Sequence, residues 1–335
     1  MKEETTMQAV SNVEKLFTMM NESAEIISKE CNLTYIEAVA ETGENLFQNE
    51  VLQDEMSEVT KKNLAKKYEQ ANISSFQKEE IRKAFQLVIL KGLKDGAHAN
   101  HQMTPDTVGL FTGYLVSKFA AGEKNISILD PAVGTGNLLT AVLNHMGGED
   151  VLSYGVEVDD LLIKLAYLNA NLGEHTVQFY NQDSLEPLYV EPVNYVICDL
   201  PVGYYPNDVG ADKYKLKADS GHSYSHHLFI EQSLNYTKAG GYLFFIVPNH
   251  LFESAEAPKL KAYLKDHAIV QGLLKLPQTL FKGKQHEKSL FILQKKGEDV
   301  SAPKHAMLAE LPSFSDKAGM QSIMKQIDGW FKENK

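Results

Sequence analysis

The sequence predicts an α/β fold with an all-α domain in front of it. The first hundred residues repeat apolar positions at helical spacing and contain no proline. From residue 126 onward, short apolar runs of β type alternate with helical patterns, which is typical of a sheet covered by helices. With 335 residues, of which 43% are hydrophobic, the chain is long enough for two domains with buried cores.

The N-terminal region is predicted to be a domain of four to five helices over residues 1–97. Val13, Leu16 and Met20 lie at helical spacing, and the same pattern returns in residues 34–50 and 81–94. We interpret these apolar stripes as core rather than as a partner surface, because such stripes most often pack inside a domain.

The most informative segment is residues 126–139. An apolar run ends in Asp130, and a turn containing Gly134 and Gly136 leads at once into an apolar helix start. Glycines in such a turn let a ligand approach the backbone closely, because no Cβ stands in the way. Leu139 stands where a dinucleotide motif has its third glycine. The turn therefore fits a nucleoside with a cationic sulfonium better than a pyrophosphate.

Three further strands are predicted to end in acidic residues. Glu157 ends the strand over residues 152–156, and it is placed to accept hydrogen bonds from ribose hydroxyls. Asp183 follows the strand at residues 177–180 and is placed to accept from an adenine amino group. Asp199 ends the next strand and precedes Leu200 and a Pro-containing turn.

Together these segments resemble the class I S-adenosylmethionine-dependent methyltransferases, and most closely the N6-adenine DNA methyltransferases and the modification subunits of type I restriction systems. The resemblance rests on the first motif at residues 130–136, on Thr104-Pro105 before it, and on the later strands at residues 240–249 and 272–296. It implies a Rossmann-like seven-stranded methyltransferase sheet whose last strand is antiparallel. It also implies a methyltransferase domain over residues 98–300, followed by a C-terminal helical extension over residues 301–335.

The resemblance implies that S-adenosyl-L-methionine is the cofactor. The residues expected to bind it are Thr104, Asp130, Ala132, Gly134, Thr135, Gly136, Asn137, Leu138, Glu157, Val158, Asp183, Ser184, Asp199 and Pro201.

The substrate motif departs from the family pattern, which is Asn, Asp or Ser followed by Pro-Pro and an aromatic residue. Here it reads Asp199-Leu200-Pro201-Val202. The Asp199 side chain and the Leu200 carbonyl are expected to accept the N–H bonds of a target amine, while Pro201 shapes the turn. Val202 cannot stack on a flipped base, so Tyr204 or Tyr205 is expected to supply that ring, with Tyr204 as the first candidate.

Charge and composition bear on the partner. The net charge of −11 argues against strong non-specific nucleic-acid binding. A mildly basic strip consists of Lys275, Lys282, Lys284 and Lys288, and it suits a phosphate backbone. DNA is expected over RNA as the substrate. Arg82 is the only arginine, although arginine is the preferred reader of guanine and phosphate. A separate specificity or partner protein is therefore expected.

Other site classes find little support. Cys31 and Cys198 form neither a disulfide framework nor a metal spacing, which favours a reducing cytoplasm. The His222–His227 segment holds three histidines without a carboxylate at ligand spacing, so no metal site is expected. The sequence shows no signal peptide and no membrane span.

Several alternatives stay open at this stage. The chain could methylate RNA or a protein glutamine, because related amine methylators use a similar Pro-containing motif. It could instead be a noncatalytic cofactor-binding scaffold. An NAD-dependent oxidoreductase is the most distant alternative.

Overall fold

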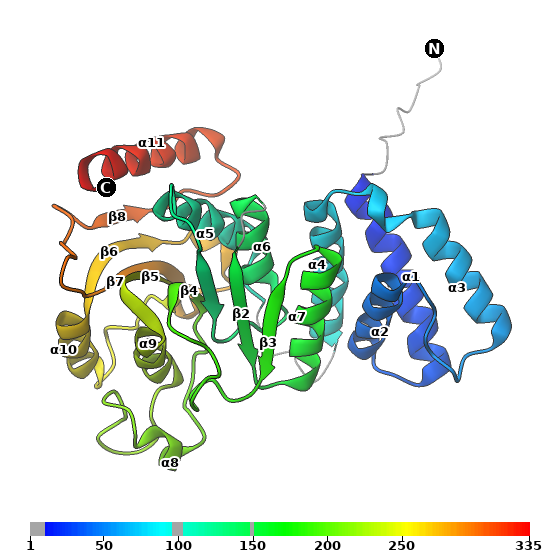
Figure 1. Cartoon of the computed structure of the whole chain (residues 1–335), viewed down its shortest axis with the longest axis horizontal. Helices are drawn as coiled ribbons and strands as arrows, with labels where there is room; N and C mark the ends of the chain where they lie inside the picture. Colours follow the sequence, from blue (N-terminus) through cyan, green and yellow to red (C-terminus); the bar gives the residue numbers. More distant parts are fainter. Residues whose placement is uncertain (1–10, 96–102, 148–150) are drawn as a thin grey trace.

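The computed structural model of the chain describes residues 11–95, 103–147 and 151–335. Helices come first along the chain, and a sheet with its covering helices follows (Figure 1). No helix within these residues combines the length and the apolarity that a membrane span needs.

The N-terminal region contains four α-helices in the described part of the chain, and three of them share the same capping. The helices are α1 (Asn12–Cys31), α2 (Tyr35–Gln48), α3 (Glu58–Ala71) and α4 (Lys78–Asp95), with the 3₁₀ turn η1 (Ile73–Ser75) before α4. Each of the first three begins after a Ser or Thr whose hydroxyl accepts a backbone N–H bond. Each ends at an asparagine with positive φ, namely Asn32, Asn49 and Asn72.

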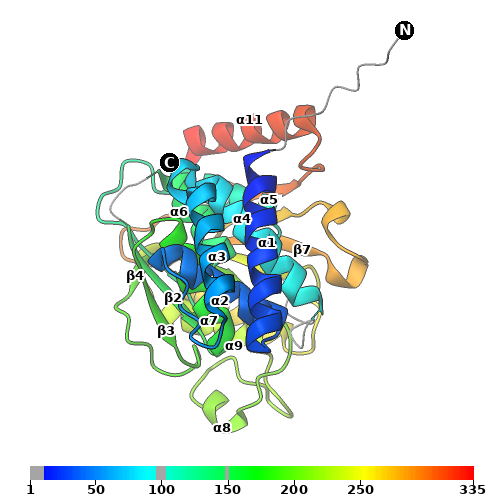
Figure 2. The same cartoon turned by 90° about the vertical axis from the view of Figure 1, so that its right-hand side faces the viewer.

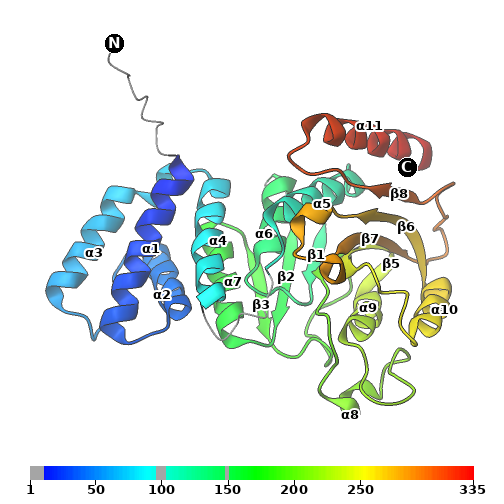
Figure 3. The same ribbon diagram turned by 180° about the vertical axis from the view of Figure 1, so that it is seen from behind.

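This helical region shares its core with the sheet domain. Buried leucines of α7 (Asp160–Leu172) pack among side chains of α1, α2 and α4. At Gly43 of α2, a Cβ would lie 3.1 Å from the Phe85 ring and 3.2 Å from Leu168, so glycine permits the close approach of α2 to α4 and α7. Seen from behind, α1–α4 stand beside α7 (Figure 3). The predicted domain boundary between residues 97 and 98 lies outside the described residues.

The sheet has eight strands in the described residues. They are β1 (Ser127–Asp130), β2 (Leu152–Glu157), β3 (Val177–Asn181), β4 (Val193–Asp199), β5 (Thr237–Pro248), β6 (Ala268–Lys275), β7 (Lys288–Lys295) and β8 (Met307–Glu310). Their order is β3-β2-β1-β4-β5-β7-β6-β8, and β7 is antiparallel to both of its neighbours. This confirms the predicted Rossmann-like sheet with an antiparallel seventh strand. It also places an unpredicted strand, β8, parallel to β6 within the segment expected to be only helical.

Helices cover both faces of the sheet. One face packs against α5 (Asp106–Phe119), α6 (Asn137–Met146) and α11 (Lys317–Asn334), and the other against α9 (Ser225–Asn235) and α10 (Ala257–His267). Alternate residues of β5 divide between the faces: Phe244 joins the first core and Phe245 the second. The turned view shows α11 above the sheet and the short helix α8 (Asp208–Ala211) below it (Figure 2).

The only arginine of the chain joins the two parts. Arg82 lies on α4, and its side chain is 1% exposed. Its guanidinium pairs with Glu79 on the same helix at 2.7 Å and with Asp106 at the start of α5. It also donates to the Asn137 side chain at 2.7 Å, at the first residue of α6. One buried cation therefore connects three helices of two regions.

We expect Arg82→Met to lower the free energy of unfolding by about 3–5 kcal/mol, because it leaves two partly buried carboxylates without the buried cation that joins them. Lys83→Met is the matched control, since Lys83 is half exposed and pairs with the same Glu79 at 3.3 Å. Loss of this partly exposed ion pair is expected to lower the free energy of unfolding by about 1 kcal/mol or less. Urea unfolding followed by circular dichroism measures both, and similar losses would contradict a special role for Arg82.

Candidate active site

The two glycines in the turn after β1 have different roles. Both glycines have positive φ, +54° at Gly134 and +77° at Gly136, where residues with a side chain are strained. A Cβ on Gly136 would lie 3.1 Å from the Ala166 Cα of α7, so this glycine permits helix packing. A Cβ on Gly134 would meet nothing within 4 Å, and Gly134 lines a cavity. Gly134 thus keeps space open for a ligand, while Gly136 packs against protein.

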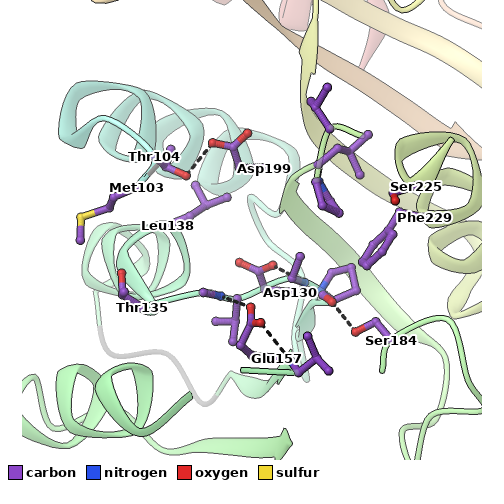
Figure 4. A pocket seen from close by; sticks show the side chains of 18 of the residues that line it. Met103, Thr104, Asp130, Thr135, Leu138, Glu157, Ser184, Asp199, Ser225 and Phe229 are labelled. Atoms are coloured by element: carbon purple, nitrogen blue, oxygen red, sulfur yellow. Dashed lines mark hydrogen bonds between the residues drawn. The ribbon is translucent and has the colours of Figure 1, made fainter. Parts of the chain in front are cut away.

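That cavity has a volume of about 630 Å³ and lies at the carboxyl ends of β1, β2, β3 and β4 (Figure 4). It brings together most of the residues predicted for the site: Thr104, Asp130, Ala132, Gly134, Thr135, Asn137, Leu138, Glu157, Val158, Asp183, Ser184, Asp199, Leu200 and Pro201. Gly136 and Tyr204 do not line it. Tyr204 is 60% exposed, and its ring stacks on Tyr224 with centroids 5.0 Å apart.

Three carboxyl groups gather at the end of the cavity formed by β1, β2 and β3. Asp130 is 1% exposed and accepts a hydrogen bond from the Ala132 N–H. Burial raises the pKa of Asp130 well above its ordinary value, and the nearby charges of Glu157 and Asp199 add to this effect. Glu157 accepts from the Gly134 N–H at 3.0 Å, which ties the glycine turn to the end of β2.

Asp183 completes this end of the cavity. Its two carboxylate oxygens accept from the Leu185 N–H at 2.8 Å and from the Tyr205 hydroxyl at 2.6 Å. Burial and the bond to Asp183 raise the pKa of Tyr205, so this phenol stays a donor. Each oxygen keeps a further lone pair that a ligand donor can reach.

This set of groups fits S-adenosyl-L-methionine. The ligand carries a cationic sulfonium, and three carboxyl groups lie beside a glycine whose missing Cβ leaves the cavity open. Apolar side chains of Met103, Leu138 and Phe229 line the same cavity and offer contacts to a nucleoside.

The other end of the cavity holds a carboxylate beside a free carbonyl. Asp199 accepts from the Thr104 hydroxyl at 2.9 Å and pairs with Lys288 at 2.6 Å. The Leu200 N–H donates to Ile246 of β5. In the parallel ladder the next donor to the Leu200 carbonyl would be the N–H of residue 248, which is a proline and has none. Among the described residues no backbone donor to the Leu200 carbonyl is found, so this carbonyl is left available to a ligand.

Sequence reasoning missed several residues that line the cavity, among them Leu93, Met103, Phe229, His250, Gln285 and His286, and it named Lys288 only as part of a basic strip. Of the two candidate tyrosines, Tyr205 lines the cavity and Tyr204 does not. A sequence signal existed for Lys288, because it begins a strand antiparallel to its neighbours. The start of such a strand lies at the same sheet edge as the ends of the parallel strands.

The chain is similar throughout its length to two proteins. A proposed class I S-adenosylmethionine-dependent methyltransferase from Listeria monocytogenes shares 46% sequence identity and superimposes with a TM-score of 0.89, covering 96% of this chain and 99% of that one. The uncharacterized protein YtxK of Bacillus subtilis (strain 168) is 51% identical over 325 residues, which is 97% of this chain and 99% of the relative.

A more distant likeness shows the fold alone. The modification subunit of a proposed type I restriction enzyme from Vibrio vulnificus YJ016 has a TM-score of 0.62 at 16% identity, covering 86% of this chain and 64% of that one.

The fold and the site thus define an S-adenosylmethionine-dependent methyltransferase of class I. Residues 88–326 match the profile of the N-6 DNA Methylase family, and residues 14–93 match that of the YtxK N-terminal helical domain. The chain belongs to the N-6 DNA Methylase family.

The two roles of the glycines can be separated by substitution. Gly134→Ala is expected to weaken S-adenosylmethionine binding about tenfold or more, because its methyl group enters the cavity, and to cost about 1 kcal/mol of stability from the positive φ. Gly147→Ala is the control, since Gly147 has φ +73° with open space around it and does not line the cavity. Calorimetric titration and urea unfolding measure both. Equal cofactor affinity in the two variants would contradict the assignment.

The buried Asp130 predicts a pH dependence of stability. Its folded pKa lies above its unfolded value, so the folded state binds the proton more tightly and stability falls as pH rises between the two values. Asp130→Asn removes this penalty and is expected to be more stable than the wild type at neutral pH. The difference should shrink as pH falls toward about 4, the ordinary aspartate value. Urea unfolding of both proteins from pH 4 to 8 tests this, and a difference that stays constant with pH would contradict it.

Proposed function

We propose that this chain methylates the exocyclic N6 amine of adenine in DNA. The observation that carries the proposal is the pair of acceptors at one end of the cavity: the Asp199 carboxylate and the Leu200 carbonyl, which Pro248 leaves without a donor. An amine with two N–H bonds needs two such acceptors. When both bonds are held, the nitrogen lone pair is directed away from them, toward the rest of the cavity.

Each end of the cavity has its own task. Asp130, Glu157 and Asp183 bind the cofactor, which when bound supplies an electrophilic methyl group on sulfur. Asp199 and the Leu200 carbonyl orient the amine and stabilise the positive charge that develops on nitrogen. Thr104 and Lys288 hold the Asp199 carboxylate in position through one hydrogen bond to each oxygen.

We further propose that a separate protein completes DNA binding. Arg82 is buried within the protein, so none of the chain's arginines is available to read guanine or phosphate. The solved neighbour from Vibrio vulnificus YJ016, whose fold this chain shares, is by its name one subunit of a larger enzyme, which supports a further protein here.

One observation favours a second candidate, a protein glutamine amide. Val202 stands where the family has an aromatic residue, and it lines the cavity at 52% exposure. An amide side chain needs two acceptors but no ring to stack on, so it meets the same acceptor pair without the missing aromatic.

The test is transfer of labelled methyl from S-adenosylmethionine into DNA, RNA and protein taken from cells that lack the gene. Label is expected in DNA adenine, and Asp199→Ala should reduce it about 10²-fold or more, because one of the two acceptors is gone. Asp328→Ala is the control, since this carboxylate also has a lysine at 2.6 Å but lies on α11, away from the cavity.

The distribution of label decides between the candidates. Label in glutamine of the protein fraction, lost in Asp199→Ala, would favour the second candidate. Cofactor binding with no label in any fraction would favour a scaffold role or a missing partner protein.

A further inference from the structure

Lys288 is placed at the acceptor end of the cavity by strand pairing. It is the first residue of β7 and pairs with Pro248 in the antiparallel ladder with β5. Pro248 is the residue that leaves the Leu200 carbonyl free. The backbone of Lys288 therefore lies close to the acceptor pair, which is the Asp199 carboxylate and the Leu200 carbonyl. Its side chain is 17% exposed, lines the cavity, and reaches the Asp199 carboxylate at 2.6 Å.

The Lys288 ammonium has more donors than the protein uses. An ammonium carries three N–H bonds and accepts none. Among the described residues, Asp199 is the one partner to which Lys288 donates a side-chain hydrogen bond. Two N–H donors of a mostly buried ammonium are thus left for whatever enters the cavity. A desolvated donor is most stable when a ligand acceptor meets it.

The acceptor pair and the lysine together present hydrogen-bond acceptors and a hydrogen-bond donor to a ligand. Asp199 and the Leu200 carbonyl accept, and Lys288 donates from a position 2.6 Å from Asp199. The substrate group that matches this pattern is an amine with a lone-pair atom next to it. In adenine, the N6 amine has such an atom on each side, N1 and N7.

We propose that Lys288 is a specificity-determining residue that donates a hydrogen bond to the ring nitrogen beside the target amine. The proposal rests on the proposed function and extends it, because it says that a ring nitrogen of the base is read in addition to the amine. A simpler role would be charge compensation of Asp199 alone. The two roles differ in a measurable way, since charge compensation cannot distinguish substrates that differ only in that ring nitrogen.

The experiment compares three oligodeoxynucleotides that carry adenine, 1-deazaadenine or 7-deazaadenine at one position. The wild-type enzyme is expected to prefer adenine over one of the two analogues by about tenfold or more in kcat/KM, as expected for a lost hydrogen bond to a charged donor. Lys288→Met should remove that preference, whereas Lys288→Arg, which keeps charge and donors, should retain part of it.

Lys275→Met is the matched control. Lys275 also lies at this edge of the sheet, where it is the last residue of β6. It is paired with carboxylates, Glu287 at 3.8 Å and Glu310 at 3.7 Å, but it does not line the cavity. It should keep the wild-type preference. Thermal unfolding and cofactor affinity of all variants show whether the fold and the cofactor site are retained.

Each outcome of this experiment supports or overturns the role proposed for Lys288. No preference in the wild type, or an unchanged preference in Lys288→Met, overturns the proposal, and so does an equal loss of activity on all three substrates. If the wild type transfers no methyl to DNA, the proposed function fails separately. Lys288 is then judged by calorimetric binding of deoxyadenosine and its two deaza analogues to protein loaded with S-adenosylhomocysteine. Loss of the adenine preference in Lys288→Met supports the proposal, and equal binding by the wild type overturns it.

Discussion

The structure depends on a chain of hydrogen bonds that begins at one buried arginine and ends at Asp199 in the cavity. Arg82 donates to the side chain of Asn137, which donates to the Thr104 carbonyl at 2.9 Å. The Thr104 hydroxyl donates to Asp199, whose other oxygen receives Lys288. Each link is buried or partly buried, so each broken link would leave an unsatisfied polar group. The helical region, the glycine turn and the substrate motif are thereby held in one arrangement.

This connection gives the N-terminal helices a part in the site. Their core includes leucines of α7, and α7 in turn packs against Gly136 of the glycine turn. Leu93 of α4 and Met103, which precedes Thr104, both line the cavity. The helices therefore form part of the wall and of the support of the site, and the family profile for this region marks it as a unit of its own.

The cavity is divided by charge, and this division explains its chemistry. Asp130, Glu157 and Asp183 make the cofactor end acidic, and burial of Asp130 without a cation is unfavourable, which is why its pKa is raised. A cationic ligand at this end would offset this cost, so its binding and the ionisation of Asp130 would favour each other. At the other end Lys288 balances Asp199, which keeps that carboxylate paired within a partly buried site.

The sequence by itself determined the features that depend on neighbours along the chain. The strand ending at Asp130, the glycine turn, and Glu157 and Asp199 at their strand ends could be predicted, because a turn and a strand end are local properties and parallel strands bring their ends to one edge. Only the tertiary structure decided which contacts form between segments that are far apart in the sequence. Lys288 reaches Asp199 across 89 residues, Tyr205 rather than Tyr204 lines the cavity, and the short strand β8 exists because β6 offers it a partner. Such contacts arise from strand pairing and packing, which no single stretch of sequence encodes.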